Sequence, residues 1–361
     1  MERNGGRCAS ASSAVPERLP PANSAIPPSL ECPDRLAQSL AKPANPLKKP
    51  TVEALFVPIL HLPSSPQLPG GKTAPDLFLI GGARCGSTSL HHYLDQHPGI
   101  HMCQPDKEPG FYCDSYGVDD PNAYAANFAG ARPGQMLGDA STPYLTCPAS
   151  AGLIHAANSN ARIVAVLRQP AERAHSLYLK MCSLGHEDAP SFETALKREA
   201  RILNEPPEWR REGYHHNFLY LHSGLYAAQL RRYFERFPRE QIRIVLFDDL
   251  IASPRRVCDE LTAWLGLPPL AELDPEPRNR AARPRSLKLQ HWLRHSLNPL
   301  LQRCRLPKRG RLMEALLEAN LDRGPAPRLS TEWRRQLTER CADDIRATAE
   351  LIGRNLDHWL R

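Results

Sequence analysis

A glycine-rich loop followed by hydroxyl residues is the segment of this sequence with the clearest capacity for chemistry. Residues 81–88 read Gly-Gly-Ala-Arg-Cys-Gly-Ser-Thr and follow an apolar run. Glycines let backbone N–H groups turn inward, and the start of a following helix adds partial positive charge, so such a loop can hold an anion. A nucleoside triphosphatase has Lys directly after the last glycine. Here Ser87 stands at that place and the cation is Arg84, which argues against ATP or GTP hydrolysis.

A second candidate anion site lies at the end of another apolar run. Arg168 follows the run over residues 162–167, and Ser176 stands eight positions later in a segment with a helical pattern. An arginine can grip a phosphate through two parallel hydrogen bonds, and a serine can bind it through its hydroxyl. Taken alone, the segment favours an ion pair of Arg168 with a carboxylate and a surface position for Ser176. Taken with the glycine loop, it indicates a ligand with phosphates at both ends.

The residues around these loops predict alternating strands and helices. Strands are expected over residues 76–80, 162–167 and 241–247, where short apolar runs occur. Helices are expected over residues 88–97 and 171–181, and another begins at Pro254 behind Ser253 as N-cap. This alternation favours an α/β fold with a mainly parallel sheet. Ligands of such sheets bind beyond the carboxyl ends of the strands, which is where both candidate loops begin.

Composition separates a leader from a folded domain. The chain has 361 residues, and 14 of its 36 prolines fall in residues 1–75, where apolar residues are few. We predict a disordered, proline-rich leader over residues 1–75 and a single domain over residues 76–361. No apolar run approaches the roughly 20 residues that cross a bilayer, so no membrane span is predicted.

The cysteines and histidines indicate a reducing compartment and no bound metal. Ten cysteines in 361 residues are far from the density of disulfide-rich domains, and none stands in a CxxC pair. The predicted location is therefore the cytoplasm. Organellar targeting by the leader is the alternative, which the five acidic residues of the leader oppose. Four histidines lie close together in the sequence, but their placement does not predict a metal site; they are His91, His92, His97 and His101.

The positive charge of the chain is concentrated in one segment. Residues 278–311 hold eleven Lys or Arg and no Asp or Glu. The formal charge of this segment therefore exceeds the net charge of +7 of the whole chain. Such a segment can attract nucleic acid, an acidic polysaccharide or a phosphorylated cofactor. The alternative is a solvated helix face around Leu287, Leu289, Trp292 and Leu293. Trp292 is the one aromatic residue of the segment, so base stacking is poorly supported and no nucleic-acid partner is expected.

Four segments in order resemble the sulfotransferases that use 3′-phosphoadenosine 5′-phosphosulfate (PAPS), particularly the bacterial and heparan sulfate type branch. Residues 81–90 (GGARCGSTSL) are similar to the 5′-phosphosulfate loop of that family, and residues 167–178 (LRQPAERAHSLY) to its 3′-phosphate motif. Residues 107–112 (KEPGFY) resemble its Lys-Glu-Pro segment, and residues 138–145 (GDASTPYL) its Ser-Pro-x-Tyr-Leu segment. The resemblance covers residues 76–361. It implies a P-loop NTPase-like three-layer sandwich, with a central, mainly parallel sheet flanked by helices.

The resemblance also implies an enzyme that moves a sulfuryl group from PAPS to a hydroxyl or amine of a small-molecule or glycan acceptor, by in-line displacement without a metal. Glu108 would be the general base, and Arg84 would contact the sulfonyl group. The implied donor-binding residues are Arg84, Cys85, Gly86, Ser87, Thr88, Ser89, Arg168 and Ser176. The thiol of Cys85 is a candidate for oxidation or alkylation. The implied substrate contacts are Lys107, Asp139 and Tyr144, and residues 114–132 and 187–222 are expected to build the acceptor pocket.

Two residues depart from the family pattern, and two other functions stay open. Arg84 stands where the family usually has Lys; it would stabilise charge on the leaving phosphate rather than donate a proton. Ala140 stands where heparan sulfate type members carry Lys, which weakens heparan sulfate as the expected acceptor. One alternative is a P-loop nucleotide kinase or NTPase, with residues 244–249 (IVLFDD) as a strand ending in metal-binding acids. The other is a basic polyanion-binding module built on residues 278–311.

Overall fold

The structure, a computed structural model, describes residues 64–114, 117–204, 215–276, 282–303, 309–322, 324–325 and 327–361. The predicted leader falls mostly on residues 1–63, which lie outside the described residues. Residues 64–75 pack onto the domain, since Leu68 and Ala74 are buried in its core and Lys72 pairs with Asp76 at 2.5 Å. The folded part therefore begins before the predicted boundary at residue 76.

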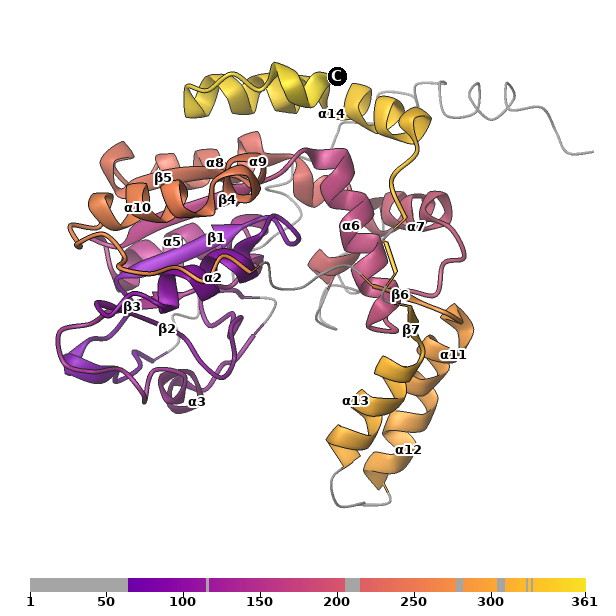
Figure 1. The fold of residues 1–361 in the computed structure, drawn as a ribbon, viewed down its shortest axis with the longest axis horizontal. Coiled ribbons are helices and arrows are strands. Elements are labelled where there is room, and N and C mark those ends of the chain that lie inside the picture. Colours follow the sequence, from indigo (N-terminus) through magenta and orange to yellow (C-terminus); the bar gives the residue numbers. More distant parts are fainter. Residues whose placement is uncertain are drawn as a thin grey trace, which may run out of the picture. The chain divides into compact units, whose positions relative to one another are not determined.

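Five parallel strands form the central sheet. They are β1 (Leu77–Gly81), β2 (Ile100–Met102), β3 (Met136–Asp139), β4 (Arg162–Leu167) and β5 (Ile242–Leu246). Their order across the sheet is β2-β3-β1-β4-β5 (Figure 1). All residues of β1 are buried, as expected for a parallel strand covered on both faces. The predicted α/β fold and its three predicted strands are confirmed, whereas β2 and β3 are short strands that the sequence patterns did not indicate.

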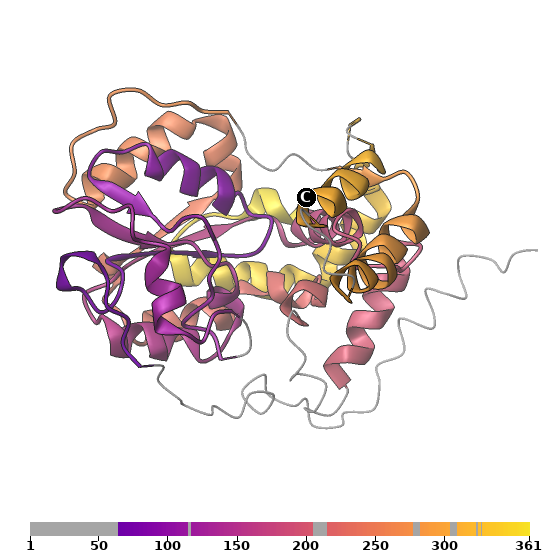
Figure 2. The same cartoon turned by 90° about the horizontal axis from the view of Figure 1, so that it is seen from below.

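Helices cover both faces of this sheet. The helices are α2 (Ser87–Asp95), α3 (Pro121–Ala126), α4 (Pro143–Thr146), α5 (Ser150–Ala157), α6 (Pro170–Ser183), α7 (Phe192–Asn204), α8 (Tyr226–Phe234), α9 (Phe247–Ala252), α10 (Pro254–Trp264), α11 (Leu287–Trp292), α12 (Asn298–Arg303), α13 (Arg309–Ala319) and α14 (Thr331–Ile352). Helices α2 and α10 lie on one face, and α5 and α8 on the other (Figure 2). The predicted helices correspond to α2, α6 and α10, and Ser253 is the N-cap of α10 as predicted.

A helical hairpin follows the sheet domain in sequence. Helix α11 continues through a π-helical turn (Leu293–Leu297) into α12, and α13 packs beside α12 (Figure 1). We call α11 to α13 the helical hairpin. A short antiparallel ribbon of β6 (Arg283–Pro284) and β7 (Leu321–Asp322) brackets it. Its α11 is anchored on the end of α6, because Gln290 Nε2 donates to Ser183 O at 2.7 Å and Arg294 Nε donates to Leu184 O at 2.8 Å.

None of the helices that the structure describes has both the length and the apolar character needed to cross a bilayer.

Candidate active site

The glycine-rich loop joins β1 to α2 through backbone conformations that few residues adopt. Gly86 has a φ of 95° and Arg84 a φ of 74°. A Cβ at Gly86 would lie 2.9 Å from the Phe247 ring, and one at Gly81 would lie 2.6 Å from Val166 O. Close packing therefore requires glycine at both positions. Gly86 is the N-cap of α2 and provides no capping side chain, so the first turn of the helix is presented to the cavity described next.

A cavity of about 460 Å³ opens where β1, β4 and β5 end. It brings together most of the residues that the sequence proposed for donor binding and catalysis, namely Arg84, Gly86, Ser87, Thr88, Ser89, Glu108 and Arg168. An apolar wall faces them, made by Tyr93, Phe247, Leu250, Ile251, Pro254 and Pro275. Helix α6 supplies a further wall through Leu177, Lys180, Met181 and Leu184.

Two arginines lie close together at the strand ends. Arg84 Nε donates to Ser176 Oγ at 3.2 Å, and an Arg168 guanidinium N–H donates to the backbone oxygen of Arg84 at 3.3 Å. Arg168 also lies 3.6 Å from Glu172 and stacks over the Phe247 ring at 4.5 Å. Burial, and then the positive charge of Arg168, lower the pKa of Arg84. The two anion sites expected from sequence are thus joined into one positively charged region.

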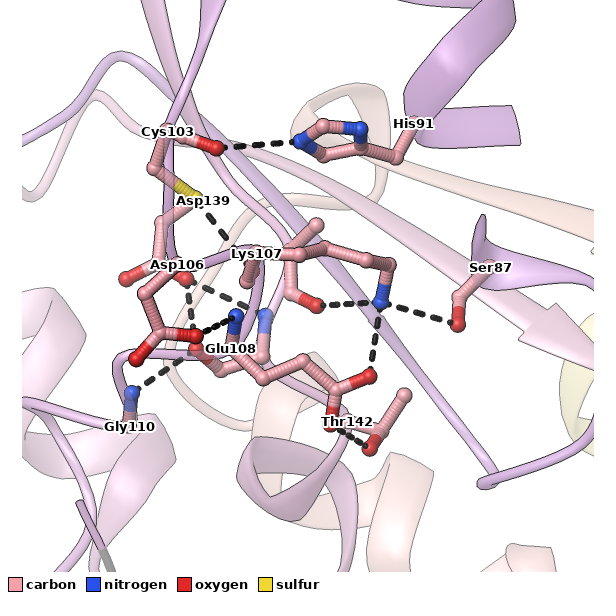
Figure 3. A network of polar contacts seen from close by, with 11 residues as sticks. Ser87, His91, Cys103, Asp106, Lys107, Glu108, Gly110, Asp139 and Thr142 are labelled. Carbon is pink, nitrogen blue, oxygen red and sulfur yellow. Dashed lines mark hydrogen bonds and ion pairs between the residues drawn. The ribbon is translucent and has the colours of Figure 1, made fainter. Parts of the chain in front are cut away.

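Glu108 is held by a cation and a hydroxyl (Figure 3). Lys107 Nζ donates to Glu108 Oε1 at 2.7 Å, to Ala140 O at 3.1 Å and to Ser87 Oγ at 3.4 Å. Thr142 Oγ1 donates to Glu108 Oε2 at 2.7 Å. Burial favours the neutral acid, but the charge of Lys107 and these two hydrogen bonds outweigh it and lower the pKa of Glu108. Glu108 is therefore an oriented carboxylate at neutral pH, with its side chain 33% exposed.

Lys180 is a cavity residue that the sequence patterns did not indicate. Burial and the nearby charge of Arg84 lower the pKa of its ammonium, while Glu108 and Glu318 oppose that change. The signal that could have found it is helical spacing, because Lys180 stands four residues after Ser176 and shares its helix face. His186 also lines the cavity and was not indicated, whereas Asn217 lines it from within residues 187–222, where acceptor contacts were expected.

Three proposed site residues are buried away from the cavity. Asp139 is fully buried and accepts hydrogen bonds from the hydroxyls of Tyr124, Tyr144 and Ser141 at 2.7–2.8 Å. Tyr144 is likewise fully buried. Because neither side chain is exposed, the prediction that Asp139 and Tyr144 contact the substrate is wrong. Their hydrogen bonds instead stabilise the segment around Ser141. Cys85 is also fully buried, within 3.5 Å of the Tyr226 hydroxyl, and burial raises the pKa of its thiol. This corrects its reading as an accessible, reactive cysteine.

The expected acceptor loops contribute little to the cavity. Residues 114–132 supply none of the described lining residues, and residues 187–222 supply Asn217 alone. Residues 115–116 and 205–214 of these loops lie outside the described residues. Among the described residues, α6 contributes more of the cavity lining than these loops do, through Leu177, Lys180 and Met181.

Two groups with metal-binding residue types lie outside the cavity. Asp248 accepts a hydrogen bond from Trp359 Nε1 at 3.0 Å, and Asp249 pairs with Arg354 at 2.7 Å. The acids that a kinase or NTPase would use are thus engaged elsewhere. Among the residues described by the structure, the carboxylate and thiol groups that gather within 4.8 Å of one another belong to Cys113, Asp114 and Cys147. The four clustered histidines make no such group in this part of the chain.

Part of the basic segment can be placed. Arg283 pairs with Asp322 at 3.1 Å, and Arg294 holds the end of α6. Arg278, Arg280, Arg305 and Lys308 lie outside the described residues, as do the side chains of Arg303 and Arg309. No described residue of the segment lines the cavity.

The parallel sheet, the glycine loop at its carboxyl edge and the flanking helices define a P-loop NTPase-like fold, with a cavity lined by Arg84 and Arg168 at that edge. A profile of the sulfotransferase domain matches residues 74–288, which is more than half of the chain, so this chain belongs to the sulfotransferase domain family. A sulfotransferase structure from Alicyclobacillus acidocaldarius is 26% identical, with a TM-score of 0.61, and the match covers 80% of this chain and 99% of that one.

Curated relatives match over shorter shares of their length. Bifunctional heparan sulfate N-deacetylase/N-sulfotransferase 1 of Caenorhabditis elegans is 26% identical over 233 residues, which cover 62% of this chain and 25% of the relative. Human heparan sulfate glucosamine 3-O-sulfotransferase 3B1 is 27% identical over 242 residues, which cover 63% of this chain and 58% of the relative. The chain therefore spans a quarter of the first relative and somewhat over half of the second.

Proposed function

We propose that this chain transfers a sulfuryl group from PAPS to a hydroxyl or amine of a glycan or small-molecule acceptor. One observation carries the proposal: a single cavity joins the glycine loop, Arg84, Arg168 and the oriented carboxylate of Glu108. Membership of the sulfotransferase domain family supports the reaction class. The kinase or NTPase alternative is not favoured, because Ser87 replaces the phosphate-loop Lys and Asp249 pairs with Arg354.

The residues present fit a donor that carries an anionic group at each end. The first turn of α2 and Arg84 would hold the 5′-phosphosulfate, and Arg168 with Ser176 would hold the 3′-phosphate. Arg168 Nε is buried and has no hydrogen-bond partner among the described residues, which supports an anion as its partner. Phe247 beside Gly86 offers an apolar face suited to a flat adenine ring.

The side chains around the cavity supply complementary roles. PAPS, when bound, provides a sulfuryl group whose S–O bond breaks with its electron pair passing to the phosphate. Arg84 would stabilise the charge that develops there, and Lys180 adds a second positive charge beside it. Glu108 would take the proton of the acceptor hydroxyl as the new O–S bond forms. Lys107 and Thr142 keep that carboxylate ionised and directed.

The acceptor class is proposed from the relatives. Two relatives are named for heparan sulfate, and a glycan acceptor for this chain is our inference from them. Ala140 lacks the side chain expected of the heparan sulfate type, but Lys107 Nζ donates to Ala140 O and brings an ammonium to that place. We also propose a cytoplasmic site of action without a nucleic-acid partner.

Transfer of radiolabelled sulfate from PAPS across a panel of glycans, phenols, lipids and peptides tests the proposal. We expect transfer by the full chain, and a loss of about 10²- to 10⁴-fold in turnover for Glu108→Gln, which removes the base but keeps the shape. The matched control is Glu339→Gln on the exposed face of α14, whose turnover should equal that of the unchanged chain.

Thermal unfolding separates binding from chemistry. 3′,5′-Adenosine bisphosphate should stabilise both the unchanged chain and Glu108→Gln, because the base is not among the proposed donor-binding residues. A clear shift with ATP and Mg²⁺ and none with the bisphosphate would contradict the donor assignment. Unchanged turnover of Glu108→Gln would contradict the assigned base.

A further inference from the structure

The helical hairpin exposes most of the large apolar side chains that the structure leaves in solvent. Five large hydrophobic residues are exposed among the described residues, and four of them lie on the hairpin: Leu289 (44%), Trp292 (51%), Leu300 (56%) and Leu312 (47%). Single exposed apolar residues are ordinary on protein surfaces, but a cluster of this kind marks a contact surface.

These side chains are distributed over all three helices of the hairpin. Leu289 and Trp292 are three residues apart on α11 and are therefore neighbours on its surface. Leu300 follows on α12, which continues α11 through the π-helical turn. On α13, Leu312 shares its exposed face with Ala315 and Ala319, at spacings of three and seven residues.

Positive charge accompanies the apolar face. Lys288 is exposed and stands four residues before Trp292, and Arg285 and Arg311 are exposed at the two ends of the hairpin. Helix α13 also carries Glu314 and Glu318, but at about 100° per residue these lie about 200° and 240° around the helix from Leu312. Glu314 therefore faces away from Leu312, whereas Glu318 lies about 60° from Ala315 at the edge of this stripe, and Lys288 borders Trp292 on α11.

This combination discriminates between partners. A polyanion such as nucleic acid or an acidic glycan would use the cations but leave the exposed leucines in water. A second copy of the chain would cover the apolar face but would bring like charges together. An anionic lipid surface accepts both, because Trp and Leu enter the headgroup boundary while Lys and Arg remain at the phosphates.

We propose that the helical hairpin docks this protein reversibly on an anionic membrane surface, with Leu289, Trp292, Leu300 and Leu312 entering the interface. Because α11 is anchored on α6 through Gln290 and Arg294, docking would hold the cavity wall near the bilayer. The proposal concerns a surface attachment and is independent of the reaction that the cavity performs.

Co-sedimentation of the full chain with vesicles tests it. We expect binding to vesicles of equal parts phosphatidylcholine and phosphatidylserine, weaker binding to pure phosphatidylcholine, and a decrease with added salt. Trp292→Ser with Leu300→Ser should lower the affinity at least about tenfold, since two apolar side chains no longer leave water. Lys288→Glu should also weaken it.

Two matched variants isolate the hairpin. Ile251→Ser removes the fifth large apolar side chain that is exposed among the described residues, and Arg346→Glu makes the same charge change on α14; both should bind vesicles like the unchanged chain. Circular dichroism and thermal unfolding check that each variant is folded.

Three results would overturn the proposal: no binding of the unchanged chain to the anionic vesicles, undiminished binding of the double serine variant, or equal binding to both kinds of vesicle. A dimer in light scattering that Trp292→Ser dissociates would also overturn it, in favour of self-association.

Discussion

At the scale of single residues, the environment of Glu108 favours orientation over basicity. Burial alone would raise the pKa of this carboxyl, but the ammonium of Lys107 at 2.7 Å and the hydroxyl of Thr142 at 2.7 Å reverse the direction. A carboxylate with a lowered pKa stays ionised over a wide pH range but attracts a proton less strongly. Two fixed hydrogen bonds leave it little freedom to turn, so the proposed base would meet its acceptor in one geometry.

Lys107→Met should move the acid limb of the pH–rate profile to higher pH. Activity that depends on the Glu108 carboxylate is lost as the pH falls through its pKa; Lys107 lowers that pKa, and its removal raises it. The measurement is sulfate transfer as a function of pH. Lys197→Met is the control, because Lys197 pairs with Glu193 on an exposed helix face and lines no part of the cavity. An unchanged acid limb in Lys107→Met would show that Lys107 does not control the pKa of Glu108.

At the scale of elements, neighbouring strands and the helices that follow them assemble the cavity. β1 and β4 pair in parallel, with Gly81 opposite Val166, so the loops after both strands emerge at the same edge. Arg84 and Arg168 thereby come within hydrogen-bond reach of each other's segments. Helix α6 then turns Ser176 toward Arg84 and places Lys180 one turn further along the same face.

Gly86→Ala should destabilise the fold more than Gly266→Ala and should also weaken donor binding. Both glycines have positive φ, at 95° and 75°, so both substitutions strain the backbone by about 1–2 kcal/mol. A Cβ at Gly86 would also lie 2.9 Å from Phe247, whereas one at Gly266 meets nothing within 4 Å. Urea unfolding and the binding of 3′,5′-adenosine bisphosphate measure the two effects. Equal losses in both variants would show that the contact with Phe247 has no importance.

At the scale of the whole described domain, a segment beyond the matched family region supports the cavity. The family match ends at residue 288, yet Asp344 on α14 accepts hydrogen bonds from the backbone N–H groups of Tyr226 and Ala227 at the start of α8. The Tyr226 hydroxyl in turn donates to Arg168 O at 2.8 Å. Gln169 Nε2 donates to Thr338 Oγ1 at 2.8 Å, which ties the same strand end to α14 directly.

Asp344→Ala should cost about 1–2 kcal/mol of unfolding free energy, because two backbone N–H groups at a helix start lose their acceptor. Donor binding should weaken as well, since the Tyr226 hydroxyl bonds to the backbone of Arg168. Denaturant unfolding and bisphosphate binding measure both changes. The neighbouring Asp343→Ala is the control, because that side chain is fully exposed and pairs only with Arg346 in the described structure. Equal unfolding free energies and equal bisphosphate binding of the two variants would contradict the inference that Asp344 stabilises the cavity.

The local sequence by itself indicated the glycine loop, Arg168 and the strands and helices that carry the two loops, whereas Glu108 was indicated by the family resemblance. A glycine-rich turn between an apolar strand and a helix depends on backbone geometry over a few residues. Its pattern can therefore be recognised within one segment of the sequence. The predicted boundary at residue 76 was less accurate, because Leu68 and Ala74 are buried by contacts distant in sequence. β2 and β3 escaped prediction for the same reason, since short strands form only against their neighbours in the sheet.

Only the tertiary structure decided which polar residues face the cavity. Asp139 and Tyr144 lie in a recognisable motif, yet packing turns them inward to bond each other. Lys180 lies in a predicted helix but was not singled out, and the approach of α6 to the loop after β1 gives it Arg84 and Glu108 as neighbours. Side-chain direction depends on which elements meet, and a burial cost or a charge interaction arises only when they do. The sequence therefore determined which groups were available, and the fold determined which of them meet.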